Sequence, residues 1–195
     1  VTWPYTVPAQ VALLRQRGIA VFVTAPDALG GIAADVVKIG ELAGTEGAAR
    51  TAARSIDRRL DALGSAARGK RNVRVFYQVA DAPIYSIGGR HLITRAIELC
   101  GGTNVLGAMS IPAPQVGVEA VLAAAPEAII AGTDNAARPR WLDAWRQWDG
   151  LPAVRYDNLY VVDANLLHRP GPRFAEGVEQ LCTALDAARR RIIGR

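Results

Sequence analysis

Apolar, strand-like runs alternate along most of this chain with amphipathic, helix-like runs. In the second half, strand-like runs occupy residues 73–80, 128–131 and 159–164, and helical patterns lie between them. Short runs rich in Val and Ile are typical of strands that are buried on both faces of a parallel sheet. The order strand, helix, strand therefore predicts an α/β fold, with helices packed on the sheet.

The beginning of the chain repeats this alternation on a smaller scale. Residues 9–17 have the pattern of a helix that ends at Gly18, and residues 29–44 have the pattern of a second helix. Between them, residues 19–25 (IAVFVTA) form a continuous apolar run that predicts a buried parallel strand. We expect residues 1–44 to be the C-terminal part of a first, incomplete α/β lobe.

The longest helical pattern covers Thr45–Arg68, where apolar side chains recur every three or four residues. A helix of about 20 residues reaches roughly 30 Å, the width of a small domain. The pattern fits a backbone helix over residues 45–69 that joins two lobes, and it fits an ordinary packing helix equally well. Residues 70–195, where the alternation restarts, are expected to form a complete C-terminal α/β lobe.

Composition excludes several classes of protein. The 195 residues are 50% hydrophobic, enough for a buried core, and carry a net charge of only +5. The arginines are dispersed through helical segments without interleaved aromatic residues, so we expect solvated helix faces and no nucleic-acid binding. No run approaches the roughly 18 apolar residues of a membrane span. The chain opens without Met or a signal peptide, and we expect sequence to be missing before Val1.

Motifs for catalysis or nucleotide binding are weak. Residues 64–71 (GSAARGKR) resemble a phosphate loop, but Arg71 stands where a hydroxyl group should hold magnesium. His91 and His168 lie in separate segments, without other ligands at metal-binding spacing, so we expect no metal site. Without a nucleophile–base pair, an enzyme is disfavoured, although a small α/β enzyme that uses the loops after the strands remains an alternative.

Loops rich in Pro and Gly follow three of the strand-like runs. Trp3 stands before the first, and the other two cover residues 77–89 and 164–173. Because ligands of open α/β sheets bind beyond the carboxyl ends of the strands, these loops predict a binding cleft.

Three tryptophans recur at helical spacing and predict one helix face that is buried against the sheet. This set is Trp141, Trp145 and Trp148.

The chain has two cysteines, Cys100 and Cys182, and each lies on the apolar side of a helical pattern. Two buried free thiols behave as small hydrophobic groups. An even count is also compatible with a disulfide in an oxidising compartment. The residues alone leave both interpretations open.

The segment RVFYQVADAPIYSIGGRHLITRAIELCGGTNVL resembles the start of the C-terminal lobe of the cobalamin-binding proteins that serve ABC importers. The segments IPAPQVGVEAVLAAAPEAIIAGT and LPAVRYDNLYVVDANLLHRPGPR continue the resemblance in the same order. The similarity covers essentially the whole chain, up to GVEQLC. The wider superfamily also binds haem, siderophores and metal ions.

The resemblance implies two α/β lobes joined by one rigid helix, the architecture of the helical-backbone (class III) binding proteins. It implies that a corrinoid binds between the lobes with little hinge closure, and that the protein is a periplasmic monomer that delivers its ligand to a membrane permease. It implies no catalytic cofactor, because cobalamin is the cargo. It also implies a disulfide between Cys100 and Cys182.

Carried over residue by residue, the resemblance implies a set of ligand contacts. Trp3 matches a tryptophan at the edge of the cleft, and Arg169 matches an arginine that donates to amide oxygens of the corrin. Asn165 stands where the best-known relatives have an acidic residue. The expected ligand-binding set is Trp3, Tyr5, Ile84, Tyr85, Asn165 and Arg169.

Two further expectations follow from the resemblance. Glu119 matches a surface glutamate that docks on the permease, although an acidic residue at a helix start also complements the helix dipole. The alternative cargo is haem or a ferric siderophore. Haem would need an axial ligand, for which Tyr5, Tyr85 and His168 are the candidates.

Overall fold

A twisted sheet at the centre of residues 73–163 organises the chain. The computed structural model describes residues 1–2, 6–134 and 138–194. Four strands lie in the order β2–β1–β4–β5, and β3 pairs with the first part of β1. All pairings are parallel except that of β2 with β1. The strands are β1 (Val73–Ala80), β2 (Tyr85–Ser86), β3 (Gly102–Asn104), β4 (Ala128–Thr133) and β5 (Leu159–Asp163).

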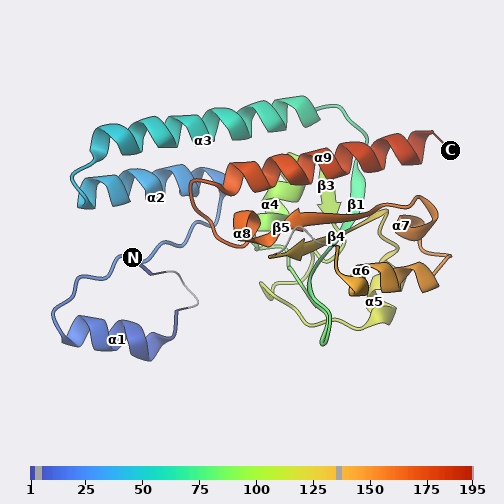
Figure 1. Cartoon of the computed structure of the whole chain (residues 1–195), viewed down its shortest axis with the longest axis horizontal. Coiled ribbons are helices and arrows are strands. Elements are labelled where there is room, and N and C mark those ends of the chain that lie inside the picture. Colours follow the sequence, from blue (N-terminus) through green and yellow to red (C-terminus); the bar gives the residue numbers. More distant parts are fainter. Residues whose placement is uncertain (3–5, 135–137, 195) are drawn as a thin grey trace.

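Helices cover both faces of this sheet, as the alternating pattern predicts (Figure 1). One face of the sheet packs against α4 and α9, with α3 beyond them, and the other face packs against the shorter helices. Tyr77 and Ile130 point to the first face, whereas Phe76 and Ile129 point to the second. The helices of this part are α4 (Leu92–Leu99), α5 (Val118–Ala124), α6 (Arg140–Asp143), the 3-10 turn η1 (Ala144–Gln147), α7 (Pro152–Arg155), α8 (Ala164–Leu167) and α9 (Phe174–Ile193).

A disulfide joins the end of α4 to α9. It links Cys100, which directly follows α4 and is completely buried, to Cys182. The pairing implied by the family resemblance is therefore confirmed. Among the described residues no cysteine is free.

The segment before the sheet consists of α1 (Pro8–Gln16), α2 (Leu29–Leu42) and α3 (Glu46–Ala67). The two longer helices lie side by side and run along the same edge of the molecule as α9 (Figure 1). They approach closely where Gly40 of α2 lies against Ala49 of α3, because a Cβ atom at position 40 would overlap the Ala49 side chain. The long helix expected over Thr45–Arg68 is confirmed within one residue at each end.

The strand expected over residues 19–25 is wrong. In this segment only Val23 pairs, in a single parallel bridge with Thr2. Parallel strands are stabilised by neighbours and by helices on both faces, but Ile19 is 50% exposed and Val23 is 40% exposed. Within the described residues, Thr2 is the only strand-like partner, so the apolar composition does not suffice to form a sheet.

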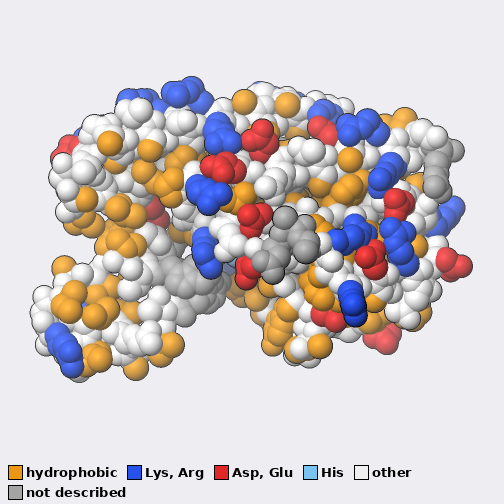
Figure 2. Space-filling model, in the orientation of Figure 1, with side chains coloured by type: hydrophobic (Ala, Val, Ile, Leu, Met, Phe, Trp, Pro, Cys, Tyr) orange, Lys and Arg blue, Asp and Glu red, His pale blue; other side chains and the backbone are white. Residues whose placement is uncertain are grey.

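Helix α1 is amphipathic in sequence but buries none of its residues. Figure 2 shows hydrophobic side chains on the surface around it, at the lower left. The exposed apolar residues of this region include Val7 and Leu13. On the rest of this face, basic and acidic side chains are interspersed, which agrees with the expectation of solvated helix faces (Figure 2).

The expected tryptophan face is confirmed in part: Trp145 and the partly buried Trp141 pack on the second face of the sheet, whereas Trp148 does not. The expected helix changes to the 3-10 turn η1 at Ala144, so the helical spacing is interrupted. Only Trp145 is buried, where its indole N–H donates to Gln78 Oε1 at 2.7 Å, while Trp148 is 38% exposed. The short elements β2, β3, α7 and α8 were not expected from the pattern.

Candidate functional site

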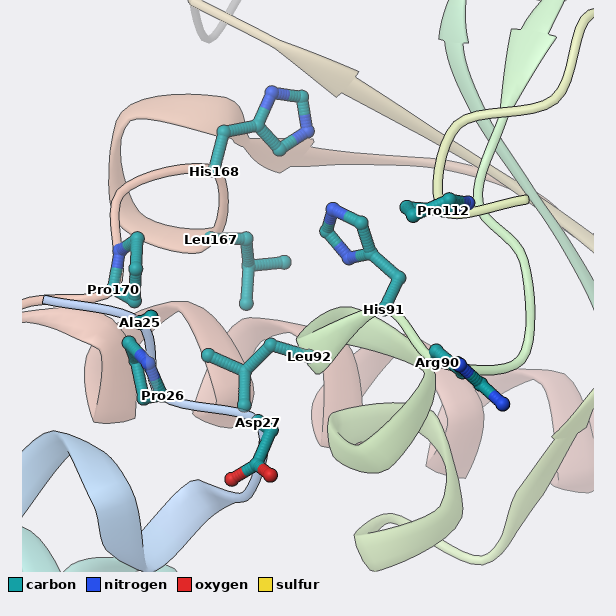
Figure 3. A pocket seen from close by; sticks show the side chains of 10 residues that line it. All are labelled: Ala25, Pro26, Asp27, Arg90, His91, Leu92, Pro112, Leu167, His168 and Pro170. Carbon is teal, nitrogen blue, oxygen red and sulfur yellow. The ribbon is translucent and has the colours of Figure 1, made fainter. Parts of the chain in front are cut away.

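A cavity of about 170 Å³ lies between the chain that enters α2 and the loops at the carboxyl ends of the strands (Figure 3). Ala25, Pro26 and Asp27 form one wall. Leu92 and Leu167 provide apolar surface beneath, and the imidazoles of His91 and His168 stand above them. The lining is Ala25, Pro26, Asp27, Arg90, His91, Leu92, Pro112, Leu167, His168 and Pro170.

His91 is positioned by the start of α4. It is the N-cap residue, and its Nδ1 accepts a hydrogen bond from the backbone N–H of Ile93 at 3.1 Å. Its Nε2 lies on the side of the ring that points toward His168 (Figure 3). Burial, reinforced by the neighbouring His168, lowers the pKa of His91 to about 4. The imidazole is therefore neutral near neutral pH.

His168 follows α8 and rests against a buried tyrosine. Its Nε2 lies 3.0 Å from the hydroxyl of Tyr77, a completely buried residue of β1. Burial raises the pKa of Tyr77, so the phenol keeps its proton. Burial lowers the pKa of His168, although the negative charge of Asp134 acts in the opposite direction. Gly132 of β4 makes the pair possible, because a Cβ atom there would overlap the Tyr77 hydroxyl and lie 2.8 Å from Nε2 of His168.

A second, more open hollow of about 550 Å³ adjoins the cavity, and His168 and Pro170 line both. Its polar lining includes Asp134, which follows β4, and Arg169. Thr24 adds the segment before α2 to this hollow. Together the two hollows form a cleft, defined here by the residues that line them, between residues 24–27 and the strand ends.

The larger hollow of about 790 Å³ lies elsewhere, between the end of α3 and the end of α4. It is lined by small residues and by charges of both signs, among them Asp61, Lys70 and Glu98. It contains part of the segment that resembles a phosphate loop, but no strand leads into that segment. We assign no ligand to it.

The structure places one of the predicted ligand residues, Arg169, in the lining of this cleft, and a second, Asn165, beside that lining. Arg169 is exposed and lines the open hollow. Asn165, in the first turn of α8, donates from Nδ2 to the backbone oxygen of Asp134 at 3.2 Å, and its backbone N–H is capped by Asp163 at 2.8 Å. Asn165 thereby ties the loop after β4 to the loop after β5.

The other predicted residues lie apart from the cleft lining or outside the described part of the chain. Tyr85 belongs to β2, pairs with Ala80 and is 37% exposed. Ile84 packs against the core on the second face of the sheet. Trp3 and Tyr5 lie outside the described residues.

Sequence reasoning missed His91, which the sequence pattern marks only as a histidine without other ligands at metal-binding spacing. A polar side chain directly before an apolar helical run is a recognisable N-cap signal. That signal could have located the start of α4 at position 91. It could not have shown that the second ring nitrogen points into the cavity, toward His168.

The described ranges contain no candidate metal site and no candidate membrane span. There, no group of three or more His, Cys, Asp or Glu side chains is placed to hold a metal ion. In the same part of the chain, the structure contains no helix with the length and apolarity needed to span a bilayer.

Comparison with known proteins identifies the family. The family described as "Periplasmic binding protein" matches residues 8–166. The chain belongs to this family. Its members bind a ligand and are not enzymes, which confirms the expectation that this chain is a binding protein and not an enzyme. A vitamin B12-binding protein of Vibrio cholerae serotype O1 (strain ATCC 39541) is 30% identical over 192 residues, which are 97% of this chain and 68% of the relative.

Solved structures of family members agree with the fold. The crystal structure of the periplasmic vitamin B12 binding protein of Vibrio cholerae has a TM-score of 0.85 at 30% identity, covering 96% of this chain and 73% of that one. The apo form of a periplasmic haem-binding protein from Roseiflexus sp. RS-1 has a TM-score of 0.81 at 20% identity, with 94% and 73% covered. The second likeness shows the fold alone. The expected α/β fold class of the helical-backbone binding proteins is confirmed.

Proposed function

We propose that this chain is the substrate-binding component of an ABC importer, which captures cobalamin or a related corrinoid and delivers it to a membrane permease. The observation that carries the proposal is the vitamin B12-binding relative, which is 30% identical over 97% of the chain. The cleft supports it, since it combines apolar surface from Leu92 and Leu167 with a few polar groups. That combination suits a ligand that presents both an apolar ring face and amide side chains.

The proposal assigns a role to each part of the chain. Residues 1–44 belong to one lobe, residues 45–69 form the backbone helix, and residues 70–195 form the other lobe. The corrinoid lies between the lobes, in contact with the predicted ligand-binding set. The protein works in the periplasm as a monomer, without a cofactor of its own.

Glu119 is the proposed contact with the permease. It lies in the first turn of α5 and is exposed, on a surface separate from the cleft lining. An exposed carboxylate can pair with arginines of a partner. Because Glu119 lies outside the cleft lining, its substitution should not affect ligand binding. We expect Glu119→Arg to abolish co-purification with the permease while the affinity for cobalamin stays unchanged; weakened cobalamin binding would contradict this separation.

Isothermal titration calorimetry tests the cargo. Cyanocobalamin, haemin and a ferric hydroxamate siderophore are titrated separately into the protein. We expect saturable heat with cyanocobalamin only. Heat with haemin alone, or with the siderophore alone, would contradict the cobalamin assignment and identify the other cargo of this superfamily.

A further inference from the structure

The hydrogen bonds of His91 determine which of its ring nitrogens carries the proton. Nδ1 accepts the backbone N–H of Ile93, so it must present a lone pair. A neutral imidazole with a lone pair on one nitrogen carries its proton on the other. The nitrogen that faces the cavity, Nε2, is therefore an N–H donor.

This tautomer has a consequence for metal-containing ligands. A histidine that coordinates a metal uses a nitrogen lone pair, and its other ring nitrogen normally donates a hydrogen bond. His91 has the opposite arrangement, because its lone pair is used to cap α4. To coordinate a metal through Nε2, His91 would have to give up the cap.

His168 is restricted in a similar way. The Tyr77 hydroxyl is completely buried, and the only hydrogen-bond partner that the structure gives it among the described residues is Nε2 of His168. A buried hydroxyl donates its proton where an acceptor is within reach. The phenol therefore donates to Nε2, and this nitrogen has no free lone pair for a metal.

The charged residues of the cavity are turned away from the two imidazoles. The Asp27 carboxylate and the Arg90 guanidinium both point away from the rings of His91 and His168 (Figure 3). The apolar side chains of Leu92, Leu167 and Pro112 line the cavity around the rings. A neutral donor above an apolar surface fits a neutral acceptor, because burying an amide carbonyl there costs less than burying a carboxylate.

We propose that His91 is a specificity-determining residue whose Nε2–H donates a hydrogen bond to a side-chain amide carbonyl of the bound corrinoid, and that neither His91 nor His168 coordinates the metal of the cargo. This inference rests on the proposed function and deepens it. It separates a corrinoid, whose periphery carries amides, from haem, whose iron calls for an axial protein ligand.

The test separates the capping role of His91 from its role as a donor. Serine and threonine are favoured N-cap residues, so His91→Ser and His91→Thr keep an acceptor for α4 and remove the N–H that faces the cavity. Loss of one such hydrogen bond is expected to raise the Kd for cyanocobalamin about five- to tenfold. Arg95→Ala is the matched control, because Arg95 is an exposed residue of α4 outside the cleft lining, and it should leave the Kd within about twofold.

Absorption spectra test metal coordination directly. Aquocobalamin carries an exchangeable water, and replacement of that water by an imidazole shifts its visible bands. We expect the bands of aquocobalamin to stay unshifted on binding to the wild-type protein. A shift that His91→Ser or His168→Gln abolishes would overturn the inference.

The outcomes distinguish this inference from the proposed function. If the wild-type protein binds cyanocobalamin and both capping variants bind it equally well, the role of His91 is wrong while the function stands. If the wild-type protein binds no corrinoid, the function itself is wrong, and the inference falls with it. Circular dichroism of the variants verifies that α4 and the sheet remain folded.

Discussion

At the scale of single residues, Gly132 is the glycine that the Tyr77–His168 pair requires. A methyl group at this position would overlap the Tyr77 hydroxyl and crowd Nε2 of His168. We expect Gly132→Ala to lower the free energy of unfolding by about 1–3 kcal/mol, as overpacking does in cores, and to weaken cyanocobalamin binding by displacing His168. Urea unfolding and calorimetry measure the two effects. Gly150→Ala, where no atom lies within 4 Å of the added methyl, should change neither.

The buried histidines give stability a defined pH dependence. Burial lowers the pKa of His91 to about 4, from an ordinary value of 6.5, so between these values the unfolded chain binds a proton that the folded chain does not. Stability is therefore highest above pH 6.5 and falls as the pH drops toward 4. The lowered pKa of His168 acts with the same sign.

Urea unfolding at pH 7.5 and pH 5 measures this effect before most carboxylates titrate. We expect the free energy of unfolding to fall by up to about 2 kcal/mol on account of His91. The decrease should be smaller in His91→Ser, and equal decreases in the two proteins would show that His91 does not contribute.

Residues of the site were harder to predict than residues of the core. Arg169 and Asn165 belong to the segment 164–173, which the rule that ligands bind beyond strand carboxyl ends assigned to the cleft, and the family resemblance singled them out within it. His91 follows β2, a strand of only two residues that the sequence pattern did not reveal. Its role depends on a hydrogen bond to Ile93 and on residues 25–27, which lie far away in the sequence, and no local pattern contains that information.

At the scale of elements, the contact between α2 and α3 depends on a small pair of residues. Gly40 and Ala49 let the helices approach so closely that a Cβ atom at position 40 would overlap that of Ala49. We expect Gly40→Ala to destabilise the protein by about 1–3 kcal/mol, despite the better helix propensity of alanine. Ala49→Gly should restore part of this loss in the double variant, because it removes the overlapping methyl group.

A double-mutant cycle measured by thermal unfolding checks this coupling. If the two substitutions are simply additive, the helices do not meet at these positions.

The disulfide between α4 and α9 closes a loop with a sequence separation of 82 residues. In chain-entropy terms, a bond that closes a loop of this size stabilises by roughly 4–5 kcal/mol, and measured values are often smaller. We expect Cys100→Ala/Cys182→Ala to lower the Tm by about 5–15 °C. Differential scanning calorimetry of the variant, and of the wild-type protein with and without reductant, measures the shift. An unchanged Tm would show that packing alone holds α9 in place.

Elements were predictable from the sequence where local pattern and tertiary environment agree. The run at 73–80 became β1 because it has strand neighbours and helices on both faces. The run at 19–25 is equally apolar, yet it makes one bridge, because the described residues supply neither neighbouring strands nor cover. Strand propensity is realised through packing, so composition could not separate the two cases.

At the scale of the whole molecule, one wall of the cleft depends on α3. Residues 25–27 enter α2 directly, and Pro26 packs on Gly31 in its first turn. Helix α2 in turn packs along α3, whose 22 residues extend roughly 33 Å. The far part of α3 is anchored to the sheet side, where Arg59 pairs with Glu179 of α9 at 3.0 Å and Gly64 lies against Leu99. The wall and the strand ends are thus held by one continuous helix.

Breaking that helix on its exposed side tests this dependence. Arg58→Pro removes a backbone hydrogen bond and forces a kink, at a cost of about 3 kcal/mol or more in a helix interior. Because Arg58 is exposed, the substitution leaves the packed face of α3 intact, and Arg58→Ala controls for loss of the side chain.

We expect the proline variant to retain the sheet but to bind cyanocobalamin at least about tenfold more weakly, since residues 24–27 no longer face His91 and His168. Small-angle scattering should show a changed radius of gyration for the proline variant only. A proline variant that keeps both wild-type dimensions and wild-type affinity would mean that the cleft is held together by contacts across it and not by α3.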